Sequence, residues 1–265
     1  MKTLKFRYHL KIEFDSPVTQ HCFTVKCTPQ SDGRQRIEQL DIRILPKEFL
    51  CEGRDSFGNS YFFGRAQTPH TLFEVVAEGA ARTGLSEGVA AGEAYQNGMY
   101  AGQTLYTQPG KELIHFFENL KLPQEGDSLE KSQLIMDGLC QHYSYVPGKT
   151  DIGTTAEQAW ELGCGVCQDY SHIMLSLCRQ AGIQCRYVVG MLKGEGLSHA
   201  WVEIAHQGQW YGFDPTNGVR VMEDHIKISH GRDYGDCLIN QGVFTGNAGQ
   251  TQTVSVIVKE AGEEV

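Results

Sequence analysis

The chain has 265 residues, of which 40% are hydrophobic and 21% are charged, and its formal net charge is −9. This length accommodates one large or two modest domains with real cores, and the composition is that of an ordinary soluble protein. The excess of negative charge would repel nucleic acid and anionic membranes, so we expect neither as a main partner.

Residues 1–15 carry charges at short intervals and contain no continuous apolar segment. No stretch of the chain approaches the about 18 apolar residues of a membrane span, so we expect neither a secretory signal nor a membrane segment. The nine cysteines are scattered and do not have the spacing of a disulfide framework, which is typical of reduced thiols. These features predict a cytoplasmic protein.

Residues 3–27 alternate apolar and polar side chains in two runs, TLKFRYHLKIEF and HCFTVKCT, separated by DSPVTQ. Such alternation predicts two antiparallel strands, each with one buried face. Further strand patterns follow, each ended by turn residues: QLDIRILP, NSYFFG and TLFEVVAEG. This succession of short strands predicts an all-β sandwich over residues 1–105, with its aromatic side chains in the core.

Residues 82–102 are rich in Gly and Ala and have no strong period, so we interpret them as the join between two domains, with short helical pieces. Helical patterns follow at residues 107–121 and 128–143. In the next segment, Thr154 and Glu157 have the spacing of a capping box that starts a third helix.

Strand patterns end the chain, at residues 183–192, 199–205 and 209–213 and in QTVSVIVKE. We expect these strands to form one antiparallel sheet beside the helices. This order, with helices followed by an antiparallel sheet, is typical of the α+β fold class. It predicts a second domain over residues 106–265.

The segment between the helices and the strands, residues 163–183, places a cysteine at the start of a helix. Its apolar residues recur with the spacing of one buried helical face: Ile173, Met174, Leu177, Cys178 and Ala181. The helix therefore begins near Cys167. Backbone N–H groups without intrahelical partners and the positive end of the helix dipole favour a thiolate there, which is the setting of a nucleophile.

Two later segments supply the partners that a nucleophilic thiol needs. In SHAWVEIA, residues 198–205, alternation places His199 on the face opposite the small apolar side chains. In QWYGFDPTNG a strand ends at Asp214, because Pro215 cannot donate to a ladder of hydrogen bonds. If these strands lie against the helix, Cys167 would be the nucleophile, with the histidine as its base and the aspartate as the orienting carboxylate.

Four motifs resemble a known family: GCGVCQDYSHIMLSLCRQAGIQCRYVVG, SHAWVEI, GFDPTNG and HGRDYGD. In this order they are similar to the bacterial branch of the transglutaminase-like superfamily, whose fold is related to papain. The resemblance covers residues 106–265 and implies that Cys167 is the nucleophile, His199 the base and Asp214 its orienter. A weaker resemblance, including DSFGN, links the first hundred residues to the β-rich domain that often precedes this core. The segment CLINQG after GRDYGD departs from the family pattern, since relatives commonly have a proline there.

The start of the helix also has other interpretations. Cys164 and Cys167 form a C-x-x-C, but neither a second pair of zinc ligands nor the preceding strand of a redox βαβ unit accompanies it. We therefore expect no metal and no cofactor, and we interpret Cys164, Cys178 and Cys185 as small buried residues. His172 is an alternative base, but it lies roughly 140° around the helix from Cys167.

For three residues of the later segments, the sequence allows either a role in the site or a structural role. Glu203 shares a strand face with the predicted base, and it either tunes that base or forms an ion pair with Arg186 or Arg179. His225 and His230 lie near the last motif and either line the cleft, pack in the interior or are exposed to solvent.

We predict an α+β protein in which a β-sandwich, residues 1–105, precedes a papain-like, transglutaminase-like catalytic core, residues 106–265. Acyl transfer through Cys167 is the expected reaction, with His199 as general base and then acid and Asp214 fixing its tautomer. A peptide or protein is the expected substrate. Water as the acceptor makes the protein a cysteine peptidase or amidase, which we expect, and an amine makes it a transglutaminase. In a third hypothesis the triad is a relic and the sandwich is a binding module.

Overall fold

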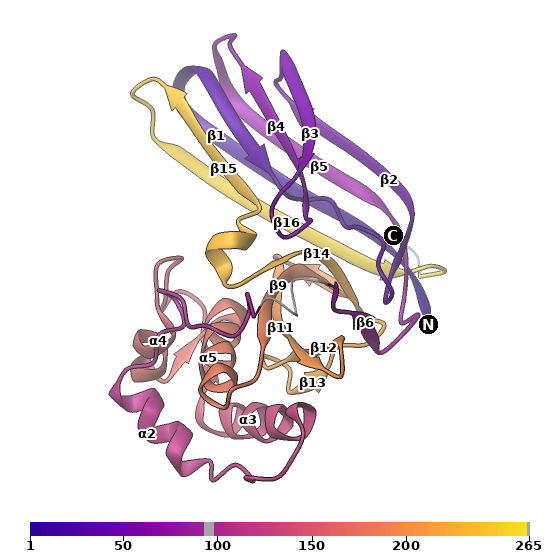
Figure 1. The fold of residues 1–265 in the computed structure, drawn as a ribbon. Helices are drawn as coiled ribbons and strands as arrows, with labels where there is room; N and C mark the ends of the chain where they lie inside the picture. Colours follow the sequence, from indigo (N-terminus) through magenta and orange to yellow (C-terminus); the bar gives the residue numbers. More distant parts are fainter. Residues whose placement is uncertain (93–97, 264–265) are drawn as a thin grey trace.

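Figure 1 shows a β-rich part of the chain lying above a second part, in which helices cover a smaller sheet. The computed structural model describes residues 1–92 and 98–263. The helical pieces expected within residues 82–102 fall partly on residues 93–97, outside the described residues. Earlier in this join, β6 (Gly88–Ala90) pairs with a strand of the lower sheet, so the join also extends that sheet.

The β-rich part is organised around β1 (Lys2–Val25), a single strand of 24 residues. The two strands predicted on either side of DSPVTQ are therefore wrong as separate elements. Two register shifts between residues 13 and 22 bend the strand without ending it. Such bulges increase the local twist, and here they carry one strand from one sheet into another.

Two sheets share β1 and face each other. The strands that complete them are β2 (Arg36–Leu45), β3 (Phe49–Arg54), β4 (Ser60–Ala66), β5 (His70–Thr83), β10 (Gly194–Gly196), β15 (Asn240–Thr245) and β16 (Gln250–Glu260). The first half of β1 pairs with β5 and β16, and the second half pairs with β4 and β15. Phe23 of one sheet packs on Phe73 of the other, with 4.6 Å between ring centroids. The predicted sandwich is present.

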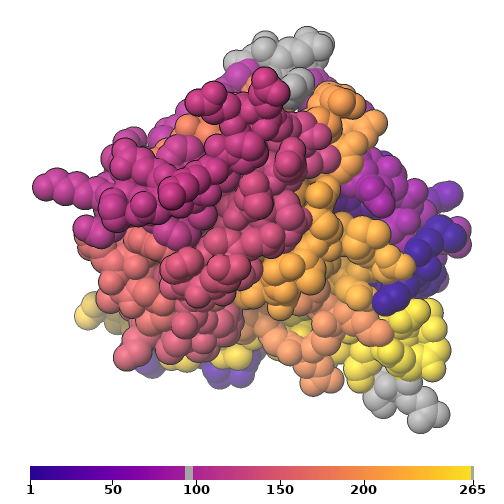
Figure 2. All heavy atoms as spheres, turned by 90° about the horizontal axis from the view of Figure 1, so that it is seen from below, coloured from indigo at the N-terminus to yellow at the C-terminus, as the bar shows by residue number. Residues whose placement is uncertain are grey.

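The last strand pattern belongs to this sandwich and not to the sheet beside the helices, which corrects the prediction. Along its length, β16 pairs with the first half of β1. The two ends of the chain therefore lie together, as Figures 1 and 2 show, and the N–H of Ala261 donates to the carbonyl oxygen of Thr3 at 2.8 Å. The division of the chain at residue 105 stays a prediction.

Within residues 98–263 the helices are α2 (Lys111–Asn119), α3 (Ser128–His142), α4 (Ala156–Leu162) and α5 (Cys167–Gln180). The predicted capping box is one residue out of place, because Thr155 and Gln158 form it. The Thr154 hydroxyl instead donates to Asp151 at 3.2 Å. Glu157 accepts three backbone N–H groups at the start of α2. Within the described part of the chain, no helix combines the length and apolar character needed to cross a membrane.

Antiparallel strands form the lower sheet: β9 (Cys185–Leu192), β11 (His199–His206), β12 (Gln209–Asp214), β13 (Val219–Arg220) and β14 (His225–Gly231), in the order β13-β12-β11-β9-β14. The helix α5 packs on β11 and β9. Met191, Ile226 and Ile228 of this sheet belong to the core of the sandwich. Because elements cover both faces, β11 is buried along nearly its whole length, and burial does not alternate there as the sequence pattern predicted.

The helix α5 is buried on all sides from Asp169 to Arg179, although its sequence predicted one buried face. Of the helices in the described ranges, α2, α3 and α4 pack against it, and in Figure 2 the segments of α2 and α3 cover much of the face seen from below. Polar side chains of α5 therefore need partners inside the protein.

Candidate active site

A buried aspartate holds the start of α5. Asp169 accepts a hydrogen bond from the backbone N–H of Val166 and another from the hydroxyl of Thr150, both at 2.7 Å. A Cβ at Gly165 would collide with this carboxylate, so only glycine permits the close approach of the chain. The helix consequently begins at Cys167, as predicted.

The antiparallel pairing of β11 with β12 brings the predicted base and carboxylate together. His199 is the first residue of β11 and Asp214 is the last residue of β12, so both lie at the same edge of the sheet. The Nε2 of His199 lies 2.8 Å from Oδ2 of Asp214. The two residues are 8% and 0% exposed, which protects this hydrogen bond from water.

His199 and Asp214 each stabilise the charged form of the other. Burial by itself would lower the pKa of His199, but hydrogen bonds to Asp214 and Cys167 raise it to about 10. Burial also opposes the ionisation of Asp214, yet the hydrogen bonds from His199 and His225 hold the pKa of this carboxyl well below its usual range. Since Nε2 faces the carboxylate, Nδ1 is the imidazole nitrogen that remains for the thiol. The imidazolium form is therefore stabilised between two acidic partners.

Asp214 has partners that the sequence did not reveal. Its Oδ1 accepts the backbone N–H groups of Thr216 and Asn217, at 3.1 and 3.2 Å. Its Oδ2 accepts the side-chain amide of Asn217 at 2.7 Å and faces Nε2 of His225 at 3.1 Å. His225 thus contacts the carboxylate directly. It is 6% exposed and is not among the residues that line the cleft, so the alternative of packing in the interior is confirmed. Its place near the last motif was the only signal of the contact with Asp214.

A metal ion could also find ligands here. The ligand atoms of His199, Asp214 and His225 lie within 4.8 Å of one another. Both imidazoles, however, direct Nε2 at the same oxygen of Asp214. A metal ion would have to replace these hydrogen bonds, so the arrangement fits the orientation of His199 better than metal binding.

Two other candidates have structural roles. The alternative base, His172, is fully buried, and its Nε2 accepts the backbone N–H of Tyr234 at 3.2 Å. Glu203 forms ion pairs with Arg186 at 2.6 Å and with Lys227 at 2.8 Å, which bears out one of the two alternatives for this residue.

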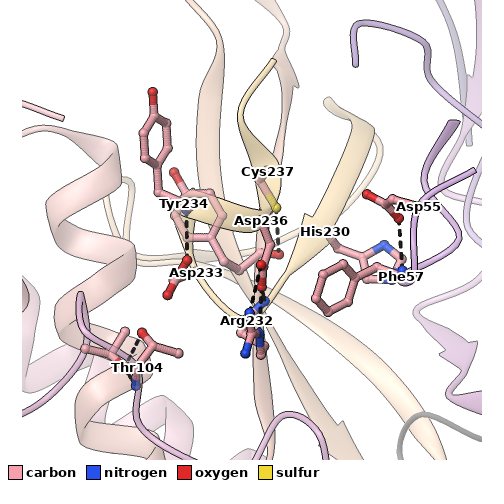
Figure 3. A network of polar contacts seen from close by, with 12 residues as sticks. Asp55, Phe57, Thr104, His230, Arg232, Asp233, Tyr234, Asp236 and Cys237 are labelled. Carbon is pink, nitrogen blue, oxygen red and sulfur yellow. Dashed lines mark hydrogen bonds and ion pairs between the residues drawn. The ribbon is translucent and has the colours of Figure 1, made fainter. Parts of the chain in front are cut away.

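The last motif, HGRDYGD, forms a turn beside the site. The short 3₁₀ helix η1 (Tyr234–Cys237) follows β14. Figure 3 shows the ion pair of Arg232 with Asp236, in which Nε and Oδ2 are 2.9 Å apart. The guanidinium carbon of Arg232 also lies 5.9 Å from the ring centroid of Phe57. This network fixes the turn, and Tyr234 lines a cleft that also contains Cys167.

A thiol at a helix start, a buried imidazole and a carboxylate at one cleft define a thiol-dependent enzyme with a papain-related arrangement. Comparison with models of protein families assigns the chain to a family. The model of the transglutaminase-like superfamily matches residues 118–215, and the model of the bacterial transglutaminase-like N-terminal region matches residues 4–82. The chain belongs to the transglutaminase-like superfamily, in the bacterial form with this N-terminal region, as its motifs predicted.

Several proteins are similar over most of their length. The uncharacterized protein ML0607 of Mycobacterium leprae is 27% identical over 260 residues, which cover 88% of this chain and 90% of that protein. The uncharacterized protein Rv2569c of Mycobacterium tuberculosis is 25% identical over 270 residues, which cover 87% of this chain and 84% of that protein. A solved structure of a candidate cysteine protease from Cytophaga hutchinsonii is 22% identical with a TM-score of 0.78, covering 100% of this chain and 93% of that chain. This similarity confirms the predicted α+β fold class.

Proposed function

We propose that the protein is a cysteine peptidase or amidase that cleaves amide bonds through an acyl-enzyme on Cys167. The observation that carries the proposal is the hydrogen-bonded series from Cys167 to His199 to Asp214, with 2.8 Å between imidazole and carboxylate. The description of the Cytophaga hutchinsonii protein as a candidate cysteine protease agrees with this choice. A peptide or protein substrate is part of the proposal, and the cytoplasmic location stays a prediction.

The proposed reaction follows from these positions. The thiolate of Cys167 attacks the carbonyl carbon, and the carbonyl electron pair moves to oxygen, where the backbone N–H of Cys167 can donate to it. As the C–N bond breaks, the imidazolium of His199 gives its proton to the leaving nitrogen. Water then attacks the thioester while His199 accepts its proton, and the thiolate leaves. Asp214 holds the imidazole in place and stabilises its charged form throughout.

A transglutaminase is the second candidate, because the family match favours it and the acyl-enzyme would be the same. An amine would then replace water in the second half of the reaction. We favour water because it is always present. The hypothesis of a relic triad is the least favoured, since the thiol, the imidazole and the carboxylate are all present in hydrogen-bonding positions.

The test compares Cys167→Ala with Cys51→Ala, which replaces an exposed cysteine away from the site. We expect Cys167→Ala to lower turnover of a peptide library by at least about a thousandfold, because the covalent step is lost. Cys51→Ala should be unaffected, and both variants should unfold at the wild-type temperature. Mass spectrometry of the products at millimolar amine should show more hydrolysis than amine incorporation.

Other outcomes would point to the other candidates. Efficient amine incorporation under those conditions would make the protein a transglutaminase. If the wild type turns over nothing, and iodoacetamide labels Cys167 no faster than Cys51, the relic hypothesis would replace ours.

A further inference from the structure

The cleft beside Cys167 has walls from both parts of the chain. Its volume is about 520 Å³. Tyr187 and Tyr234 of the catalytic part line it, and the sandwich contributes Tyr8 from β1 and Val254 from β16. Figure 1 shows the sheet that contains β1 and β16 lying above the lower sheet. A substrate at the thiol therefore meets side chains of the sandwich.

Apart from Cys167 and His199, the described walls of this cleft carry no charged side chain. Among residues 1–92 and 98–263, no Asp, Glu, Lys or Arg lines it, although the chain contains 23 Lys and Arg and 32 Asp and Glu. Besides Cys167, His199 and the tyrosines, the polar side chains of the cleft are neutral, namely Gln168, Ser198, Asn240 and Gln252. A charged substrate side chain would lose its water here without gaining a counter-ion, which is unfavourable.

Apolar side chains continue to the rim of the cleft. Tyr145, Ile152 and Leu197 line it and are 54%, 66% and 68% exposed. They come from two segments of the chain, because Tyr145 and Ile152 precede α5 and Leu197 precedes His199. Exposed apolar side chains grouped around a concave site are typical of binding sites for apolar ligands.

We infer that the enzyme selects amide substrates whose side chain next to the scissile bond is apolar and uncharged, such as phenylalanine or leucine. The sandwich takes part in this selection through the cleft wall at Tyr8 and Val254. The neutral polar groups are suited to the backbone of the substrate. This inference rests on the proposed function of Cys167 and adds a class of substrate to it.

The test uses peptidyl vinyl sulfones that alkylate a thiol and differ in one side chain: Phe, Leu, Lys or Glu. Mass spectrometry follows the rate at which each probe labels Cys167. We expect the Phe and Leu probes to react at least about a hundredfold faster than the Lys and Glu probes, because a charge is not paired in this cleft. Equal rates for all four would overturn the inference.

Three variants locate the selection. Val254→Asp and Leu197→Asp each add a carboxylate to the cleft, and Thr253→Asp is the control, because neighbouring residues of a strand face opposite sides. We expect the first two to raise the ratio of Lys-probe to Phe-probe labelling at least about tenfold, and the control to leave it unchanged. Since Leu197 is at the surface, an unchanged ratio in its variant cannot reflect misfolding and would refute binding at the rim. A change in Leu197→Asp without one in folded Val254→Asp would refute the role of the sandwich.

These probes also separate the inference from the proposed function. Selective labelling without hydrolysis of the corresponding peptides would uphold the selection and reject the hydrolase. Hydrolysis of peptides with charged and apolar side chains at equal rates would do the reverse.

Discussion

Asp214 keeps a negative charge inside the protein because its carboxylate has many donors. It accepts the N–H groups of Thr216 and Asn217 and the Asn217 side chain, and it also faces His199 and His225. A buried carboxyl without such donors would hold its proton. The charged carboxylate in turn favours the protonated form of His199, whose pKa is raised to about 10. One buried residue thus determines the charge of its neighbour in the site.

Asp214→Asn should therefore lower the pKa of His199 from about 10, because the histidine loses a hydrogen bond and an adjacent negative charge. The alkaline limb of the pH profile of kcat/KM should move to lower pH, because the imidazolium must protonate the leaving nitrogen, and kcat/KM should fall at least about a hundredfold. Asp41→Asn, at a carboxylate that is 67% exposed, is the control. A variant with a reduced melting temperature but wild-type kinetics would remove Asp214 from the mechanism.

The same shift predicts how pH affects stability. Because the folded pKa of His199 lies above the ordinary value of 6.5, its protonated form stabilises the folded state. This contribution is fully present below the ordinary pKa and is lost as pH rises toward the folded value. In Asp214→Asn, the melting temperature should therefore decline less steeply as pH rises from 6.5 to about 10 than it does in the wild type.

At the scale of elements, the start of α5 depends on the strand before it. The strand β8 (Cys164–Gly165) pairs in parallel with β7 (Ser144–Tyr145). Gly165 lets this pair approach the Asp169 carboxylate, which accepts the N–H of Val166. The helix start and the cleft rim at Tyr145 are thereby held together, so the position of the thiol depends on one close contact.

Gly165→Ala should disturb that contact, because its Cβ would collide with Asp169 and with the hydroxyl of Tyr143. We expect the free energy of unfolding in urea to fall by about 1–3 kcal/mol, and alkylation of Cys167 to become slower. Gly102→Ala is the matched control, since a Cβ there meets nothing within 4 Å. Equal stability of the two variants would show that the chain relaxes around the added methyl group.

Across the protein as a whole, the two parts share strands and a cleft. β15 and β16 follow the proposed catalytic residues in sequence but pair with β1. Between β9 and β11 along the chain, β10 pairs with β16, just before Leu197 and His199. The sandwich consequently supports the segment that carries the proposed base, His199.

A fragment of residues 106–265 should therefore not fold independently, although the sequence predicted it as the catalytic domain. Its strands β15 and β16 would lack β1, and an unpaired apolar strand favours aggregation. Circular dichroism should show no cooperative thermal transition for this fragment. Mixing it with residues 1–105 should restore the transition and the labelling of Cys167. A fragment that melts cooperatively by itself would mean that the pairing of β15 and β16 with β1 contributes little stability.

Local patterns in the sequence were sufficient for the start of α5 at Cys167, the end of β12 at Asp214 and the class of the fold. Helical spacing, alternation and a proline after a strand each depend on a few neighbouring residues. The ordered motifs added the family. These features placed His199 and Asp214 at strand ends, although the contact between them required the pairing of β11 with β12.

Tertiary structure alone decided which elements meet. Alternation in β1 and β16 shows which side chains are buried but not which strand lies alongside, so neither the continuous β1 nor its pairing with β16 followed from sequence. The same holds for His225, which reaches Asp214 from another strand. Burial of β11 and α5 on all sides depends on elements from both ends of the chain. This is because a residue pattern reports one face of one element, whereas partners are selected when distant faces pack together.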